Sequence, residues 1–316
     1  MHILGFDVGG TKISSVIGTD RGEIIKTVRR RTVKHLGREH LVRQLIDLGE
    51  EVKKRANVSS IDRIGIVFAG LVDGTKGIIK TSPNILGLRE FNVKTPLEDH
   101  FRVNVTLEND ATGATIAERL FGRGKDTDNF VYLTLSTGIG GGAFVNGRLL
   151  KGSHGLAGEF GHMVIMSNGP ICSCGRKGCL EAVAGGNSIA RRVSESVTAL
   201  RGSEILSHID PDKISAKVVF DAMRKGDMLS RLVIEETIYY LAVGIVNIAS
   251  ILDPDVVIIG GGISNAGNAL FRPLRDAIRE EFKGMRRPLR VVRGLRRGAD
   301  LASISVPIFY ENNHLP

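Results

Sequence analysis

The sequence predicts an α/β protein built from two similar halves. Short apolar runs rich in β-branched residues alternate with segments of helical periodicity, which is typical of this fold class. The opening order of apolar strand, glycine-rich turn and two further strands occurs again from residue 130 onward. Because no low-complexity linker separates the halves, we expect a hinge between two lobes near residues 110–120.

The first half is predicted to open with three consecutive strands, over residues 3–7, 13–18 and 23–30. The break before the third strand, Asp20-Arg21-Gly22, has the composition of a hairpin turn. The elements that follow are a helix, a strand, a second strand and a second helix, over residues 39–54, 64–68, 103–108 and 111–121. The last strand and helix meet at Asn109 and Asp110.

The second half repeats this order with strands over residues 130–136, 141–145 and 147–150. A long, largely apolar helix over residues 230–252 follows, and then a strand over residues 256–259 that ends in three glycines. We therefore expect a small N-terminal lobe over residues 1–115, completed by residues 301–316, and a large lobe over residues 116–300.

Composition excludes several classes of protein. The 316 residues are 42% hydrophobic and 24% charged, the ordinary mix of a globular protein of about two domains. Apolar runs such as residues 256–259 have strand length, not the ~20 residues of a membrane helix, and the N-terminus lacks the regions of a signal peptide. We expect a cytoplasmic protein with no membrane segment.

The net charge of +9 concentrates in residues 26–43 and 272–297. Nucleic acid, an anionic ligand or a basic surface could each account for such an excess. We interpret both segments as solvated faces, with part of the second able to attract an anionic nucleotide.

The first motif with chemical potential is Asp7-Val8-Gly9-Gly10-Thr11-Lys12, between two predicted strands. Its glycines let backbone N–H groups approach a phosphate, while Thr11 and Lys12 add a donor and a charge. Asp7, at a strand end, can hold a hydrated Mg²⁺. A tight hairpin with a chance aspartate is the alternative interpretation.

Two further glycine-rich turns lie in the second half. Residues 134–142, which include Thr137 and Gly138, occupy the same place as the first motif, and the pair indicates two phosphate-binding loops facing across a cleft. Residues 258–264, which include Gly261 and Gly262, end a strand and could pack against a base and ribose. The spacing is not that of a dinucleotide fingerprint.

Asp110 stands where the strand meets the helix, and local sequence allows two roles for it. Aspartate is among the best helix N-caps. A carboxylate at a cleft floor can also act as the general base that accepts the proton of an attacking hydroxyl. Both roles need the same local geometry, so the sequence leaves them open.

All three cysteines, Cys172, Cys174 and Cys179, fall within eight residues that also hold two glycines, and His162 lies ten residues upstream. This pattern predicts a Cys₃His tetrahedral zinc site of structural type, since no ligand position stays vacant. Three reduced core thiols are the alternative.

Glu159 and Glu181 flank the predicted zinc ligands. As isolated acidic residues they are consistent with exposed charge. If the metal turns them and one nitrogen of His162 toward a cleft, they become hydrogen-bonding groups for a polyhydroxylated ligand. A neutral sugar suits such groups better than an anion does.

Six segments, in order over nearly the whole chain, resemble the ROK family of sugar kinases and repressors: residues 7–12, 108–110, 135–142, 158–162, 172–181 and 252–262. The glucokinases and hexokinases of the family are the most similar group. The resemblance implies a two-lobed fold of the actin, hexokinase and Hsp70 (ribonuclease H-like) type, with nucleotide and sugar in a cleft between the lobes.

The resemblance also implies a role for each matching residue. Asp110 would be the catalytic base, and His162 would bridge the zinc ion and the sugar. Sugar contacts would come from Asn109, Asp110, Glu159, His162, Glu181, Gly70 and Asn84. Nucleotide contacts would come from Asp7, Gly9, Gly10, Thr11, Lys12, Thr137, Gly138, Gly261 and Gly262.

The sequence departs from the family pattern around two of the sugar positions. Residues 68–72, with Gly70, stand where many relatives have a Pro-Gly-Pro turn, and residues 84–88 end in Leu88 where tryptophan is frequent. Sugar selectivity therefore stays open, as does the choice among ATP, ADP and polyphosphate as phosphoryl donor.

The expected activity is ATP- and Mg²⁺-dependent phosphorylation of the 6-hydroxyl of a hexose, glucose first, to give glucose 6-phosphate. N-acetylmannosamine, N-acetylglucosamine, fructose or a broad hexose range are the alternatives. A repressor of the family would need a DNA-binding segment before Asp7, and an ATP-driven module without a small substrate would not need Glu159 and Glu181 beside zinc. No nucleic acid partner is expected, and by resemblance the chain would form a homodimer or homotetramer.

Overall fold

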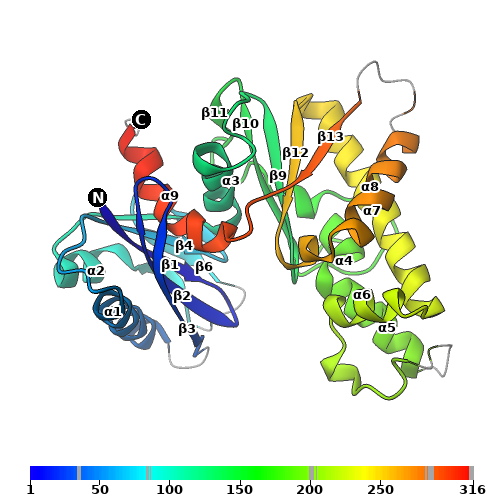
Figure 1. Ribbon diagram of the computed structural model, residues 1–316, viewed down its shortest axis with the longest axis horizontal. Helices are drawn as coiled ribbons and strands as arrows, with labels where there is room; N and C mark the ends of the chain where they lie inside the picture. Colours follow the sequence, from blue (N-terminus) through cyan, green and yellow to red (C-terminus); the bar gives the residue numbers. More distant parts are fainter. Residues whose placement is uncertain are drawn as a thin grey trace. The chain divides into compact units, whose positions relative to one another are not determined.

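The computed structural model describes residues 1–33, 37–82, 85, 87–198, 203, 205–281, 283 and 288–312. The chain divides into two compact units, which we call unit 1 (Met1–Asp126 with Leu295–Pro316) and unit 2 (Thr127–Gly294) (Figure 1). The division differs from the expected boundaries at residues 115 and 301. Helix α3 (Asp110–Phe121) packs along α9 (Gly298–Asn312), so the whole of α3 stays in unit 1.

Unit 1 is organised around a five-stranded sheet of order β3-β2-β1-β4-β8. Its strands are β1 (His2–Val8), β2 (Lys12–Thr19), β3 (Ile24–Arg31), β4 (Arg63–Phe68) and β8 (Val105–Asn109). The first three pair antiparallel, whereas β4 and β8 run parallel to β1. The carboxyl ends of β1, β4 and β8 therefore lie at one edge of the sheet.

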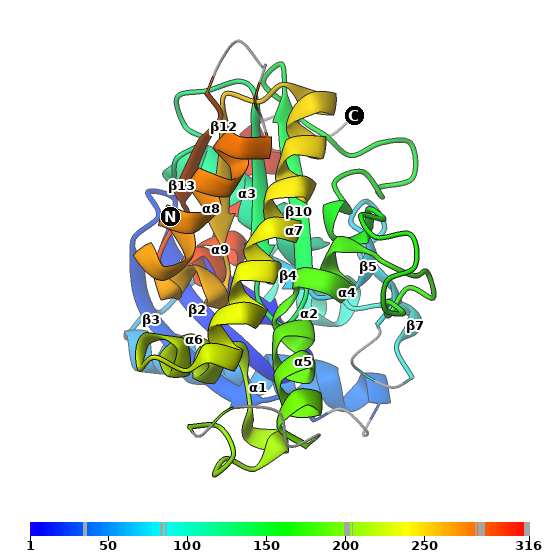
Figure 2. The same ribbon diagram turned by 90° about the vertical axis from the view of Figure 1, so that its right-hand side faces the viewer.

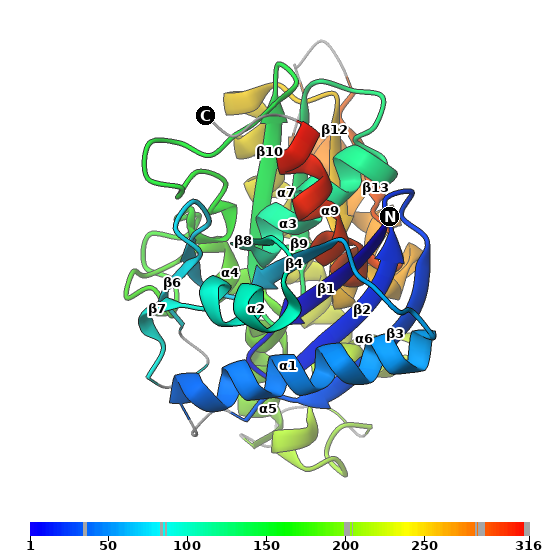
Figure 3. The ribbon, with the colours of Figure 1, turned by 90° about the vertical axis from the view of Figure 1, so that its left-hand side faces the viewer.

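Helices cover both faces of this sheet. Helix α1 (Gly37–Ala56) lies across β1, β2 and β3, and its apolar stripe packs on Leu4 and Phe6 (Figure 3). Helices α9 and α3 cover the opposite face, where Ile3 and Val16 contact them. A Cβ on Gly65 would lie 1.9 Å from the carbonyl oxygen of Ser303, so α9 sits directly on the strands.

The remaining elements of unit 1 are a small sheet of β5 (Leu71–Asp73), β6 (Ile78–Thr81) and β7 (Arg89–Asn92), and helix α2 (Lys94–Phe101). The strand predicted from residue 103 begins at Val105 instead. Arg102 ends α2 in a left-handed conformation (φ 58°), and the Glu98 carboxylate accepts the N–H of Val105 at 3.0 Å. Glu98 thus holds the chain where the strand starts.

Unit 2 repeats the sheet of unit 1, with the order β11-β10-β9-β12-β13. Its strands are β9 (Phe130–Leu135), β10 (Ile139–Val145), β11 (Arg148–Leu149), β12 (Val256–Gly260) and β13 (Arg290–Arg293). Again the first three pair antiparallel and the last two run parallel to the central strand. The repeat predicted from the sequence is confirmed in topology.

The helices of unit 2 are α4 (Leu180–Ala184), α5 (Gly186–Thr198), α6 (Ala216–Arg224), α7 (Met228–Leu252) and α8 (Asn268–Glu281). Helix α7 lies beside α8, and its buried face belongs to the core of the unit (Figure 2). By length and hydropathy alone α7 could also span a membrane, but 56% of its most apolar stretch is buried inside the protein.

Candidate active site

The parallel edge of unit 1 gathers four of the predicted site residues. Asp7 pairs with Val67 across β1 and β4, and Phe68 pairs with Asn109 across β4 and β8. Gly70 follows β4 and accepts a hydrogen bond from Asn109 Nδ2 at 3.2 Å. Asp110 comes next in the chain, so this edge holds Asp7, Gly70, Asn109 and Asp110.

The N-cap of helix α3 is Asn109, not Asp110. Asn109 has extended dihedral angles (φ −64°, ψ 147°), and its Oδ1 accepts the N–H groups of Ala111 and Thr112 at 2.9 and 3.1 Å. Asp110 is the first helical residue, and its partly exposed carboxylate accepts the N–H of Ala111 at 2.9 Å. The role of N-cap therefore belongs to Asn109 and does not explain Asp110.

Asp7 carries the most perturbed carboxyl group of this edge. Burial and the neighbouring charge of Asp110 raise the pKa of Asp7 to about 7, although Lys12 and Arg29 oppose the shift. Two carboxylates close together at a strand edge provide the oxygen ligands that Mg²⁺ prefers. The donor set therefore fits a hydrated divalent cation.

The first glycine motif forms a tight hairpin between β1 and β2. The N–H of Gly9 donates to the carbonyl oxygen of Lys12 at 3.1 Å, and the hydroxyl of Thr32 donates to the carbonyl oxygen of Gly9 at 2.6 Å. Gly10 is partly exposed at the tip, and the side chains of Thr11 and Lys12 are exposed there. The tip therefore presents one hydroxyl and one ammonium group to a ligand.

Behind this hairpin lies a buried carboxylate, Asp300 of α9, that sequence reasoning missed. Asp300 accepts hydrogen bonds from Ser14 Oγ at 3.0 Å, from Arg29 at 2.8 Å and from Arg297 at 2.9 Å, and its charge also raises the pKa of Asp7. The two basic segments of the sequence thus each supply one arginine to Asp300. The one signal in the sequence for this role of Asp300 is that an acidic residue stands in the first turn of an otherwise largely apolar helix.

The second and third glycine turns lie together in unit 2. Thr134 pairs with Gly260 where β9 and β12 end. Gly261 has a left-handed φ of 80°, and a Cβ there would lie 2.3 Å from the carbonyl oxygen of Leu135. Gly262 is exposed next to Ser136. The edge equivalent to that of unit 1 is thus formed by glycine backbone.

The N-terminus of α5 closes this glycine edge. The N–H of Gly186 donates to the carbonyl oxygen of Ser136 at 2.9 Å, and the N–H of Asn187 donates to that of Thr137 at 2.9 Å. Thr137 itself is exposed. These bonds fix the second turn against a helix start, where partial positive charge favours an anion.

Glu181 connects the second glycine turn with the cysteine loop. Its Oε2 accepts the N–H of Ile139 at 2.9 Å, and its Oε1 accepts the hydroxyl of Ser173 at 3.2 Å. A Cβ on Gly138 would lie 2.1 Å from that Oε2. Glycine is therefore required at residue 138 for the carboxylate to reach the turn.

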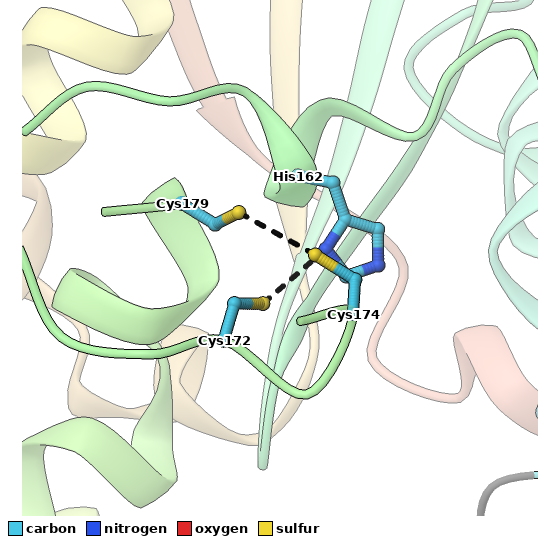
Figure 4. A group of neighbouring side chains, drawn as sticks. All are labelled: His162, Cys172, Cys174 and Cys179. Carbon is cyan, nitrogen blue, oxygen red and sulfur yellow. Dashed lines mark hydrogen bonds between the residues drawn. The ribbon is translucent and has the colours of Figure 1, made fainter. Parts of the chain in front are cut away.

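The three cysteines and His162 form the cluster that their spacing predicts (Figure 4). Their ligand atoms all lie within 4.8 Å of one another. Cys174 and Cys179 sulfurs are 3.7 Å apart, and Cys172 Sγ is 3.5 Å from His162 Nδ1. Tetrahedral zinc bonds would set such separations at about 3.5–3.8 Å. The arrangement is compatible with structural Zn²⁺.

Local electrostatics act in opposite directions on two of the thiols. The backbone N–H of Arg176 lowers the pKa of Cys174 to about 6, whereas burial raises the pKa of Cys179 to about 12. A metal ion binds the deprotonated forms of both. His162 turns Nδ1 toward the thiols, and its Nε2 lies 3.9 Å from Oε2 of the half-exposed Glu159.

The structure thus brings the predicted site residues into two groups. Unit 1 holds Asp7 to Lys12, Gly70, Asn109 and Asp110, and unit 2 holds Thr137, Gly138, Glu159, His162, Glu181, Gly261, Gly262 and the three cysteines. Asn84, the remaining predicted sugar contact, lies outside the described residues.

The sequence profile of the ROK family matches residues 3–292, and the chain belongs to this family. A glucokinase of Thermotoga maritima is 37% identical over 88% of this chain and 87% of the relative. An N-acetylmannosamine kinase of Haemophilus influenzae is 33% identical over 84% of this chain and 82% of the relative. The family resemblance of the six segments is confirmed.

Solved structures agree on the fold. A ROK family glucokinase from Streptomyces griseus, in complex with glucose and AMPPNP, matches with a TM-score of 0.85 at 28% identity, over 99% of this chain and all of that chain (100%). The expected α/β fold of actin and hexokinase type is confirmed.

Proposed function

We propose that this protein is an ATP-dependent hexose kinase that phosphorylates the 6-hydroxyl of glucose and yields glucose 6-phosphate. The observation that carries the proposal is the Cys₃His cluster, which sits beside Glu159 and Glu181 and holds His162 between thiols and carboxylate. An ATP-hydrolysing protein that binds no sugar would not require carboxylates beside a metal cluster. The glucokinase of T. maritima and the glucose-bound enzyme of S. griseus support the choice of glucose.

Asp110 is the proposed base. Its carboxylate, held by the N–H of Ala111, would accept the proton of the attacking 6-hydroxyl. Asp7 would hold Mg²⁺, which neutralises phosphate charge when bound. The hydroxyl of Thr11 and the ammonium of Lys12 orient the transferred phosphate, so the rate enhancement comes from positioning and electrostatics.

The nucleotide is proposed to contact both glycine edges. Thr137 and Gly138, fastened to the start of α5, would receive phosphate oxygens, and the bare backbone at Gly261 and Gly262 would receive the adenosine. Gly9 and Gly10 would let the first hairpin approach the same phosphates. ATP is the proposed donor, with ADP and polyphosphate as outcomes of the test below.

The sugar is proposed to be bound by Asn109, Asp110, Glu159, His162 and Glu181, with further contacts from Gly70 and Asn84. Zinc would order this wall by fixing the ring of His162 and the loop that hydrogen-bonds Glu181. We propose the two lobes of residues 1–115 with 301–316 and of 116–300 as approximate functional halves, whose closure expels water.

A second sugar is favoured by one observation, the N-acetylmannosamine kinase relatives at 33% identity. A xylose repressor of Caldicellulosiruptor bescii is also 28% identical over 88% of this chain and 70% of its own length. We propose catalysis rather than repression, without a nucleic acid or membrane partner, in the cytoplasm, as a homodimer or homotetramer.

The test is a matrix of initial rates. Glucose, N-acetylmannosamine, N-acetylglucosamine and fructose are each offered with ATP, ADP or polyphosphate, in the presence of Mg²⁺, and phosphorylated sugar is quantified. We expect the highest kcat/KM for glucose with ATP. Nucleotide hydrolysis that no hexose stimulates would contradict the proposal, and a gel shift with operator-type DNA would detect a repressor.

A further inference from the structure

The chain crosses between the two units twice, and the same side chain, that of Glu118, binds the backbone of unit 1 next to both crossings. The chain leaves unit 1 after Asp126 and returns at Leu295. Arg123 stands just before the first passage, and Leu295 is the first residue after the second. The carboxylate of Glu118 accepts the backbone N–H of Arg123 with Oε2 at 2.9 Å and that of Leu295 with Oε1 at 2.6 Å.

Glu118 also holds the first passage through its main chain. Its carbonyl oxygen accepts the N–H groups of Gly122 and Gly124, both at 3.1 Å. A Cβ on Gly122 would lie 2.0 Å from Glu118 Oε2, so only glycine lets the chain turn this closely around the carboxylate. One residue near the C-terminus of α3 thus organises the whole segment that leads out of unit 1.

The second crossing is held by hydrogen bonds at two consecutive residues, Gly294 and Leu295. The N–H of Gly294, the last residue of unit 2, donates to the carbonyl oxygen of Ile259 in β12 at 2.9 Å. The next N–H, that of Leu295, donates to Glu118. The return of the chain is therefore short, and its backbone is held at Leu295 by the carboxylate of Glu118. Two residues further on, Arg297 donates a hydrogen bond to the hydroxyl of Thr27 at 2.7 Å.

Glu118 is 1% exposed, and burial of a carboxylate is costly unless it is hydrogen-bonded. Burial raises the pKa of Glu118, and the N–H groups of Leu295 and Arg123 oppose that shift. Hydrogen bonds to a charged acceptor are among the stronger ones, so the carboxylate joins the two passages firmly. A shorter or neutral side chain could not accept both N–H groups equally well.

We propose that Glu118 is a positioning residue for phosphoryl transfer, which joins the two passages into one pivot so that unit 2 turns on unit 1 as a single body. The inference rests on the proposed kinase function, because lobe closure matters for that reaction. Two independently moving passages would allow many relative orientations of the units. A common pivot reduces that number.

The experiment uses the full-length Glu118→Gln variant, whose side chain has the same size but only one acceptor atom. Hydrogen–deuterium exchange without substrates is measured by mass spectrometry in peptides over residues 119–126 and 292–298. We expect exchange at least about tenfold faster in both peptides, since each hydrogen bond to a charged group is worth that much or more. The matched control is Glu98→Gln, which removes the same kind of bond at Val105 and should affect only that site.

Kinetics distinguish a pivot from a merely structural bond. We expect kcat of Glu118→Gln to fall by about tenfold, the KM values for glucose and ATP to change by less than about threefold, and Glu98→Gln to keep its kcat. Faster exchange in only one of the two peptides, or an unchanged kcat, would overturn the proposal.

If Glu118→Gln does not fold, the proposal is tested by hydrogen–deuterium exchange of the wild-type protein. Saturating glucose and AMPPNP should then change exchange in both peptides to the same extent and over the same time, whereas a change in one peptide alone would overturn the pivot. A wild-type protein that phosphorylates no hexose would refute the proposed function instead, and the substrate-free exchange would still show whether Glu118 joins the passages.

Discussion

The sheets of the two units have the same strand order and orientation but end in different chemistry. At the parallel edge of unit 1, Asp7 lies next to the last residue of β1 and Asp110 directly follows β8, while Asp300 of α9 is buried nearby. At the equivalent edge of unit 2, β9 and β12 end with glycine turns, and the acids Glu159 and Glu181 come from a separate loop beside the thiols. The shared topology brings the same strand ends together in both units, and the residues at those ends determine which ligands or reactions each unit could support.

Unit 1 contributes mainly charged groups, whereas unit 2 contributes mainly backbone groups in a fixed geometry. Unit 1 provides carboxylate oxygens that could bind a cation or accept a proton. Arg29 and Arg297 bind the buried carboxylate of Asp300 and so offset part of the negative charge that accumulates there. Unit 2 offers backbone N–H groups and a candidate metal-fixed loop, which bind neutral hydroxyls and phosphates by geometry. Substitutions in unit 1 should therefore affect chemistry, and those in unit 2 should affect binding.

The largest effect is expected for Asp110→Asn. Loss of the proposed base should lower kcat for glucose phosphorylation by about 10²–10⁴-fold, because a neutral amide cannot accept the hydroxyl proton. Zinc content and melting temperature should stay close to those of the wild type. Asp99→Asn, at an exposed position of α2, is the control and should keep full activity. An Asp110→Asn variant with more than a tenth of the wild-type kcat would contradict the assignment.

The next effect is expected for Cys174→Ala. Removal of one of four ligands should release the metal and disorder the loop that holds His162 and Glu181, which raises KM for glucose by about ten- to a hundredfold. Elemental analysis and glucose titration should show the two losses together. Lys177→Ala, in the same exposed loop, should keep both. A metal-free wild-type protein with normal kinetics would argue against any role for zinc.

A smaller effect is expected for Gly138→Ala. The added Cβ would lie 2.1 Å from Glu181 Oε2, so the carboxylate must leave the N–H of Ile139. We expect kcat/KM for glucose to fall by about tenfold, the cost of one charge-assisted hydrogen bond. Gly298→Ala places its Cβ 4.0 Å from the nearest atom and should keep normal kinetics. Equal kinetics of the two variants would contradict the proposed contact.

The smallest effect is a change in the stability of the ligand-free protein. The pKa of Asp7 is about 7 in the folded state and 3.8 when unperturbed, so the folded protein binds the extra proton between these values. Stability from this group is therefore full below the unfolded pKa and is lost as pH rises through about 7.

Asp7→Asn removes that loss. At pH 8 the variant should melt higher than the wild type by roughly 2 °C or more, and the difference should shrink toward pH 4. Thermal melts of both proteins across this range, without nucleotide or Mg²⁺, give the comparison. A variant that melts lower than the wild type at pH 8 would show that ionised Asp7 is well solvated or paired.

Local patterns explain why much of the fold and the zinc cluster follow from the sequence. The strands around Asp7 and residues 130–136 were predictable because each apolar run is bounded by glycine. Cys172, Cys174 and Cys179 were predictable because their ligand geometry is set within one short loop. In both cases the determining contacts are close in sequence.

Other features depend on partners far apart in the chain. Ser14 is separated by 286 residues from Asp300, and Glu118 by 177 from Leu295, so no local pattern reveals either carboxylate. The role of Asn109 as N-cap shifts the helix start by a single residue, which sequence patterns do not resolve. The unit boundary lay beyond prediction for the same reason, since it depends on the packing of α3 along α9.

The most direct test of the central claim is the position of the transferred phosphate. Glucose and 6-deoxyglucose are each incubated with the wild-type protein, ATP and Mg²⁺, and the products are examined by ³¹P and ¹³C NMR. We predict that glucose gives only the 6-phosphate and that 6-deoxyglucose inhibits competitively without accepting phosphate. Phosphate on any carbon of 6-deoxyglucose, or on a position of glucose other than 6, would contradict the account.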